Sequence, residues 1–104
     1  MKIIQQGDIL FIPIKEIPKE AKKVESKKYH ILAEGEATGH SHRVSVKEVD
    51  FYTIKDQKFV KLWGEVARVL HEEHKTKELT NPLYEVKTIQ EYDYDTEQAR
   101  QIRD

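Results

Sequence analysis

Short apolar or alternating runs, separated by turn residues, constrain the fold of this chain more than any other feature of its sequence. Residues 9–14 form a nearly continuous apolar run, whose length and branched side chains favour a buried strand over a helix. Residues 40–47 alternate instead, and one face of that strand carries His40, His42, Val44 and Val46. Comparable runs lie at residues 29–33, 49–54, 58–63, 66–71 and 83–94, and the runs at 49–54 and 58–63 predict a hairpin around residues 55–57. Regular short strands of this kind predict a mostly-β fold, a small barrel or sandwich.

Three further segments carry expectations about local structure. Residues 15–28 are polar and rich in lysine, which predicts a solvated connection with room for one helical turn over residues 19–23. Asp95 as an N-cap, with Gln98 in the capping-box position, predicts a short C-terminal helix. The alternation of residues 83–94 places three tyrosines on one face of the strand, Tyr84, Tyr92 and Tyr94. This face either packs against the rest of the fold or brings one hydroxyl to a functional pocket.

Composition limits the classes of function that this chain can have. Its 104 residues predict a single domain, residues 1–104. The 18 basic and 19 acidic residues nearly cancel, so no overall field recruits nucleic acid or an acidic membrane. Because cysteine is absent, disulfides and thiolate metal sites are excluded. No apolar run approaches the roughly 20 residues of a membrane span, and no signal-peptide core is visible. We therefore expect a cytoplasmic protein with no membrane partner, and the oligomeric state stays open.

Four of the five histidines lie in two short clusters, His40-Ser41-His42 and His71-Glu72-Glu73-His74. Histidines two apart on a strand point to the same face, so His40 and His42 can converge on one ion. His71 is the expected third ligand, because it shares the inward face of its own run. Imidazole and carboxylate ligands suit a divalent metal, with zinc the first candidate and iron or manganese as alternatives. The sequence thus predicts a metal site of His40, His42 and His71.

Chemistry at such a site needs further groups. Glu73 and His74 follow His71 directly and are candidates for a general base or a fourth ligand, and Arg43 is a candidate for stabilising developing negative charge. These roles predict a hydrolase acting on phosphate esters. The clusters do not match a named metalloenzyme signature: no glutamate follows His42 at the spacing seen in cupins, and the second cluster is one residue short of HExxH.

Two other functions fit the same residues. Without a metal, two histidines can act as base and acid on a phosphodiester, with Arg43, Lys75 and a tyrosine stabilising the charged intermediate, which would make a small ribonuclease. The substrate would then be RNA, whereas the metal site would take a small molecule or RNA. In the third interpretation the histidines only join loops by hydrogen bonds, and the domain is a partner-binding adaptor.

Four blocks of the sequence resemble a small prokaryotic family that has no characterised activity. They are Gln6-Gly7-Asp8-Ile9-Leu10, Leu32-Ala33-Glu34-Gly35-Glu36 with Thr38-Gly39-His40-Ser41-His42, Leu70-His71-Glu72-Glu73-His74, and Tyr84-Glu85-Val86 with Gln90-Glu91-Tyr92. Members of the family have the pattern GD(V/I)L, GE.TGHAH, HEEH and Y.V..Q.EY. The resemblance implies a shared site at the histidine blocks. The chain departs from the family at Lys75-Thr76-Lys77, where the approach to the last strand is usually more apolar and rich in proline.

Overall fold

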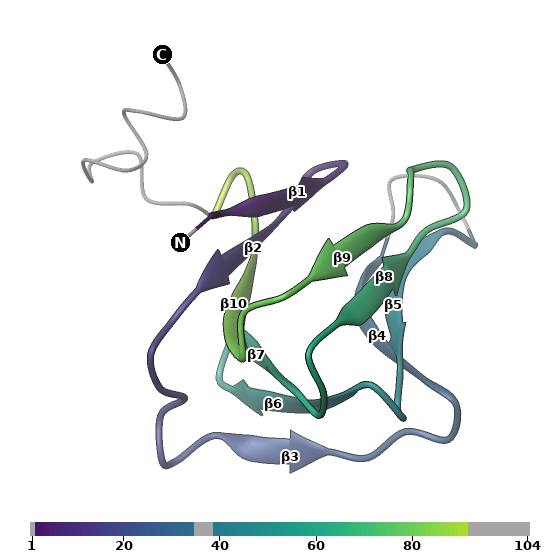
Figure 1. Cartoon of the computed structure of the whole chain (residues 1–104). Coiled ribbons are helices and arrows are strands. Elements are labelled where there is room, and N and C mark those ends of the chain that lie inside the picture. The colour runs from purple at the N-terminus through teal and green to yellow at the C-terminus, as the bar shows by residue number, and fades with distance from the viewer. Residues whose placement is uncertain (1, 35–38, 92–104) are drawn as a thin grey trace.

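The computed structural model describes residues 2–34 and 39–91, and within them ten strands form two antiparallel sheets (Figure 1). The six-stranded sheet has the order β1-β2-β10-β7-β6-β3. Its strands are β1 (Ile4–Gln6), β2 (Ile9–Pro13), β10 (Leu83–Thr88), β7 (Gln57–Leu62), β6 (Val49–Ile54) and β3 (Lys22–Val24). The four-stranded sheet has the order β4-β5-β8-β9. Its strands are β4 (Tyr29–Glu34), β5 (Ser41–Ser45), β8 (Ala67–Leu70) and β9 (Lys77–Leu79).

Local sequence explains the hairpin of β6 and β7. Val49 pairs with Leu62 and Ile54 with Gln57, so two residues make the turn. Lys55 begins that turn with φ of 53°, the left-handed conformation that two-residue hairpins require. The hairpin predicted around residues 55–57 is confirmed.

The four-stranded sheet is built around the alternating strand β5. Its inward residues His42 and Val44 are almost fully buried, at 1% and 0% exposure, while Arg43 lies on the other face. The pairing of β4 with β5 shifts register between Ile31 and Ala33, which is a β-bulge. Beside this bulge the Lys58 ammonium, from the six-stranded sheet, donates a hydrogen bond of 2.9 Å to the Leu32 carbonyl.

The two sheets enclose one hydrophobic core. The six-stranded sheet supplies Ile9, Phe11, Val49, Phe51, Val60, Leu62, Tyr84 and Val86, and the four-stranded sheet supplies Leu32, Val44, Ala67, Val69 and Leu79. A smaller cluster forms around Leu10, with Ile3, Ile12 and Ile89 packed against it. Because Leu10 and Phe11 are neighbours on one strand, they point to opposite faces, which places the smaller cluster on the outer side of the six-stranded sheet.

The fold class predicted from the sequence is wrong as stated. The mostly-β content agrees, but the described strands form two separate antiparallel sheets and no closed barrel. No helix occurs among the described residues, and the predicted C-terminal helix from Asp95 to Gln98 lies outside them. Hydrophobic patterning identifies strands, whereas closure into a barrel depends on strand tilt and stagger, which the pattern does not contain.

Two other segments differ from expectation. The helical turn expected over residues 19–23 is only a tight turn, in which the Ala21 N–H donates to the Pro18 carbonyl at 3.0 Å, and the edge strand β3 follows and pairs with β6. The long strand expected over residues 83–94 ends at Thr88, where the Thr88 N–H donates to the Glu91 carboxylate at 2.8 Å and the Glu91 N–H donates to the Thr88 hydroxyl at 3.0 Å. Tyr92 and Tyr94 lie outside the described residues. No helix among residues 2–34 and 39–91 has the length and apolar character of a membrane span.

Candidate functional site

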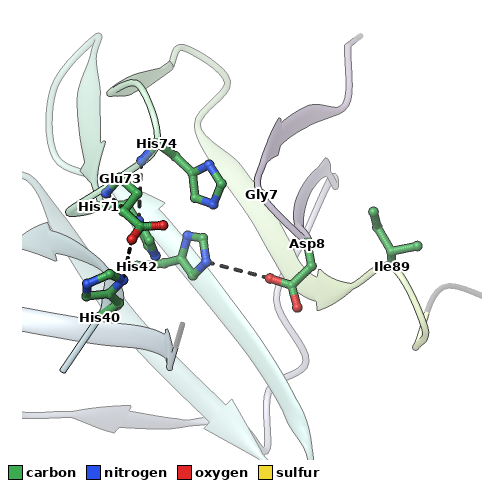
Figure 2. A pocket seen from close by; sticks show the side chains of 8 residues that line it. All are labelled: Gly7, Asp8, His40, His42, His71, Glu73, His74 and Ile89. Atoms are coloured by element: carbon green, nitrogen blue, oxygen red, sulfur yellow. Dashed lines mark hydrogen bonds and ion pairs between the residues drawn. The ribbon is translucent and has the colours of Figure 1, made fainter. Parts of the chain in front are cut away.

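Both predicted histidine clusters line one pocket, which we call the histidine pocket (Figure 2). Its volume is about 570 Å³, it is open to solvent, and its walls are Gly7, Asp8, His40, His42, His71, Glu73, His74 and Ile89. Four segments converge there: the start of β5, the loop between β8 and β9, the turn between β1 and β2, and the residue that follows β10. The four imidazole rings are near neighbours, with centroids 4.5 Å apart for His42–His71 and His71–His74, and 6.1 Å for the nearly parallel rings of His42 and His74.

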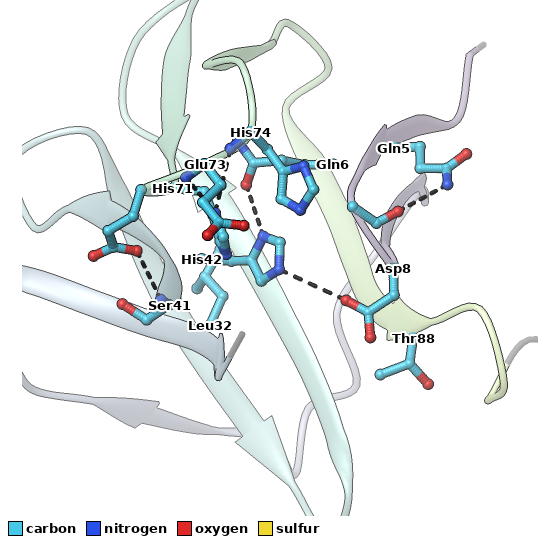
Figure 3. Close-up of polar contacts among 12 residues, drawn as sticks. Gln5, Gln6, Asp8, Leu32, Ser41, His42, His71, Glu73, His74 and Thr88 are labelled. Atoms are coloured by element: carbon cyan, nitrogen blue, oxygen red, sulfur yellow. Dashed lines mark hydrogen bonds and ion pairs between the residues drawn. The ribbon is translucent and has the colours of Figure 1, made fainter. Parts of the chain in front are cut away.

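His42 is held by a buried glutamine (Figure 3). Gln6 is only 1% exposed, and its Oε1 lies 2.8 Å from Nδ1 of His42. The amide nitrogen of Gln6 donates to two backbone carbonyls, Val69 at 2.9 Å and Lys75 at 3.0 Å, which fixes the orientation of the amide. Its oxygen therefore faces the ring and accepts a proton from Nδ1. His42 thus carries its proton on Nδ1, and its Nε2 is left with a lone pair.

The surroundings of His42 keep it neutral. Burial is the first cause and the neighbouring His71 the second of a pKa lowered to about 4, while the Asp8 carboxylate acts in the opposite direction. Nε2 of His42 lies 3.8 Å from Oδ1 of Asp8. At neutral pH this ring is an electron-pair donor next to a carboxylate.

The remaining histidines differ in which nitrogen is free. Nδ1 of His40 lies 3.6 Å from a carboxylate oxygen of Glu73. This favours a proton on Nδ1 and leaves the lone pair of the ring on Nε2. His71 has the opposite arrangement, because its Nδ1 accepts the backbone N–H groups of Glu73 at 3.0 Å and His74 at 3.4 Å. A neutral His71 therefore carries its proton on Nε2.

Gly7 makes room for His74. A Cβ at this position would lie 2.6 Å from Nε2 of His74, closer than real contacts allow. Gly7 also has φ of 59°, which favours glycine. Both observations explain why glycine occupies the turn that faces the ring.

Five of the six predicted site residues line the histidine pocket: His40, His42, His71, Glu73 and His74. Arg43 does not. Its Nη1 donates to Glu72 at 3.0 Å, and its guanidinium lies 5.6 Å from the centre of the Tyr29 ring. Glu72 also accepts the backbone N–H of Ser41, and this bond first, then Arg43, lowers the pKa of the Glu72 carboxyl.

Sequence reasoning missed Gln6, Gly7 and Asp8 as parts of the site. Gln6 and His42 are 36 positions apart, and no local spacing connects them. The available signal was the turn itself, a glycine followed by an acidic residue directly before a buried strand.

The imidazole and carboxylate groups of the histidine pocket suit a metal ion, but in this structure they are not arranged around a common coordination centre. Among the described residues, no group of three or more His, Cys, Asp or Glu side chains is positioned to hold a metal ion. The hydrogen bonds at Nδ1 of His71 account for part of this, because they occupy the lone pair of Nδ1 and leave the proton of the neutral ring on Nε2.

Comparisons with known proteins give a family and no activity. A family model described as a domain of unknown function (DUF8820) matches residues 5–89. This range contains the whole of the histidine pocket. No curated protein and no solved structure matches the chain.

Proposed function

The chain belongs to this family of unknown function, and we propose from the geometry of its own residues that it is a divalent-metal-binding protein. The metal site is the histidine pocket. Zinc is the first metal to test, with iron and manganese as alternatives, since all three accept imidazole together with carboxylate.

The observation that carries this proposal is the setting of the His40–His42 pair. Nδ1 of each ring faces an acceptor, the Glu73 carboxylate for His40 and the Gln6 amide oxygen for His42. Metal-binding histidines commonly donate the N–H of the non-binding nitrogen to a carboxylate or carbonyl oxygen, which orients the ring and raises its basicity. The same arrangement here leaves Nε2 of both histidines as the ligand atom.

The charge of the histidine pocket also favours a cation. The formally charged residues in its lining are Asp8 and Glu73, and no lysine or arginine is among them. A pocket of neutral imidazoles and two carboxylates attracts a metal ion and repels an anion that arrives without one. The metal-free ribonuclease is less favoured, because two of its expected anion-stabilising groups are not in this pocket: Arg43 is bound to Glu72, and Lys75 does not line the pocket.

Closing the site needs small movements. Two ligands of a tetrahedral zinc lie about 3.3 Å apart when each is about 2.05 Å from the metal, whereas Nε2 of His42 and Oδ1 of Asp8 are 3.8 Å apart. His74 is the third ligand that can move most freely, since no hydrogen bond holds its ring nitrogens within the described ranges. His71 becomes a ligand only after its bonds to two backbone N–H groups are broken.

Hydrolysis of phosphate esters is the activity that we propose for this site. A bound divalent metal would lower the pKa of a water molecule to about 7, giving a nucleophile at neutral pH. Glu73 lines the same pocket and is the candidate base for that water. The adaptor function remains the third candidate, and no specific contact of the described residues favours it.

Metal binding is tested by elemental analysis of untagged protein and by melting in zinc or chelator. A ligand that binds only the folded state at 100 times its Kd adds about 2.7 kcal/mol, which is a rise of about 10–20 °C for a domain of this size. We expect His42→Ala to abolish the rise and His30→Ala, at the second buried histidine, to retain it. Equal melting temperatures in zinc and chelator would reject the proposal.

A further inference from the structure

A second hollow adjoins the histidine pocket and has the opposite charge. It is lined by Gln5, Gln6, Gly7, His74, Lys75 and Lys77, and we call it the lysine hollow. Its volume is about 480 Å³. It shares Gly7 and His74 with the histidine pocket, so the two cavities meet at the ring of His74.

Lys77 has an unusual position for a lysine. It pairs with Val69 across β8 and β9, and residues opposite each other in a ladder share a face of the sheet. Val69 is fully buried in the core, so Lys77 lies on the core-facing side of the sheet, where its side chain is half-buried. A lysine on this face loses hydration that an exposed lysine keeps.

Neither lysine of the hollow is neutralised by the protein. Among residues 2–34 and 39–91, no acidic side chain forms an ion pair with Lys75 or Lys77, and no carboxylate lines the hollow. The backbone of Lys75 is fixed, because its carbonyl accepts the Gln6 amide. Two lysines that line one hollow with no counter-ion, one of them on a core-facing position, make a site for a doubly charged oxyanion.

We propose that the lysine hollow binds a phosphate group of the substrate, while the reacting group of the same molecule lies in the histidine pocket. The position of the reacting group in the histidine pocket rests on the proposed function, whereas phosphate binding in the lysine hollow does not. The contrast of charge supports it: the two lysines attract an anion that the carboxylates of the histidine pocket repel, so a substrate carrying its own phosphate is oriented before it meets the metal.

The binding half is tested on metal-free protein with inorganic phosphate. We would titrate phosphate at pH 8, where it is mostly doubly charged, and at constant ionic strength, following the amide resonances of residues 74–77. Acetate, a singly charged carboxylate, is titrated in the same way as the control anion. We expect saturable shifts with phosphate and weaker ones with acetate. No saturation, or equal affinity for both anions, would overturn the phosphate assignment.

Variants locate the site. Lys77→Met keeps the aliphatic part of the side chain and should weaken phosphate binding about tenfold, the effect of losing one charge-assisted hydrogen bond. Lys75→Met should act in the same direction. Lys27→Met, an exposed lysine outside the hollow, is the control and should have no effect. Equal losses in Lys77→Met and Lys27→Met would show diffuse attraction and overturn the proposal.

Zinc affinity of the same variants separates this inference from the proposed function. Lys75 and Lys77 do not line the histidine pocket, so both variants should bind zinc as the parent protein does. Zinc binding without phosphate binding would reject the lysine hollow alone. Phosphate binding without zinc binding would reject the metal site and leave the hollow as an anion site.

Discussion

Two buried histidines on the inner face of the four-stranded sheet have different surroundings. His30 lies opposite Val44, and His42 lies opposite Ala33. Both are nearly inaccessible, at 4% and 1% exposure, and burial is the first cause of a lowered pKa in each. His30 packs against the Phe51 ring at 5.6 Å, and its Nδ1 lies 3.1 Å from the Ser26 hydroxyl. His42 instead faces two further histidines and a carboxylate.

This difference teaches that burial of a histidine does not by itself indicate a site. His30 is a core residue that contacts the Ser26 hydroxyl and the Val49 backbone, whereas the ring of His42 is oriented by an amide that also fixes two backbone carbonyls. The free nitrogen of His42 opens into a pocket. Its neighbours, more than its burial, make His42 a candidate ligand.

The largest expected effect is the loss of stability when the hydrogen-bond partner of His42, rather than that of His30, is replaced. Gln6→Met removes three hydrogen bonds, those that the Gln6 amide makes with the Val69 and Lys75 carbonyls and with the His42 ring N–H. We expect a loss of about 4 kcal/mol in the free energy of unfolding of the metal-free protein, because each unpaired buried group costs roughly 1–3 kcal/mol. Ser26→Ala should cost about 1 kcal/mol, since Ser26 is exposed. Urea unfolding measures both, and similar losses would remove the distinction between the two settings.

Acid should destabilise the fold chiefly through His42. Its pKa is about 4 in the folded protein and 6.5 in the unfolded chain, so between these values the unfolded chain binds a proton that the folded protein does not. The contribution of His42 to the free energy of unfolding is therefore fully present above pH 6.5, and about 3 kcal/mol of it is lost as the pH drops toward 4. His30 contributes in the same direction. His42→Gln should remove most of the slope of stability against pH between 6.5 and 4.5, and His30→Gln less of it. Identical slopes in the two variants would contradict this ranking.

A pair of glycine variants tests the position of His74. Gly7 and Gly39 both have positive φ, 59° and 83°, so alanine at either position should cost about 1.5 kcal/mol. At Gly7 the new Cβ also collides with His74, whereas nothing lies within 4 Å at Gly39. Because an imidazole at the end of a side chain can swing away, we expect similar stability of the two variants but about tenfold weaker zinc binding in Gly7→Ala. Calorimetric titration with zinc measures the difference, and unchanged affinity in Gly7→Ala would remove His74 from the ligand set.

The smallest effect concerns Tyr84, the one tyrosine of the predicted tyrosine face that the structure describes. Its hydroxyl accepts the backbone N–H groups of Thr80 at 3.1 Å and Asn81 at 2.9 Å, and Tyr84 does not line the histidine pocket. Tyr84→Phe should cost about 1 kcal/mol of stability and leave zinc affinity unchanged. A loss of zinc affinity would connect this part of the core to the histidine pocket.

Local patterns predicted the parts of this protein that depend on local contacts. The hairpin around residues 55–57 and the inward face of His42 follow from a tight turn and from the two-residue period of a strand. The pattern failed where hydrogen bonds of particular side chains decide. Alternation continues past Thr88, but hydrogen bonds between Thr88 and Glu91 end the strand there. The approach of Gln6 and Asp8 to His42 depends on how the two sheets face each other, which no spacing in the sequence encodes.

The bulge in β4 has a consequence for how the protein behaves at high concentration. β4 is an edge strand of six residues, and Ile31 on it is 45% exposed, a combination that would otherwise offer a template for a strand of another molecule. The register shift interrupts the regular spacing of its free backbone groups, and the Lys58 ammonium already occupies the carbonyl of Leu32. The bulge therefore discourages pairing of this edge with a strand of another molecule, and the chain stays protected from edge-to-edge aggregation.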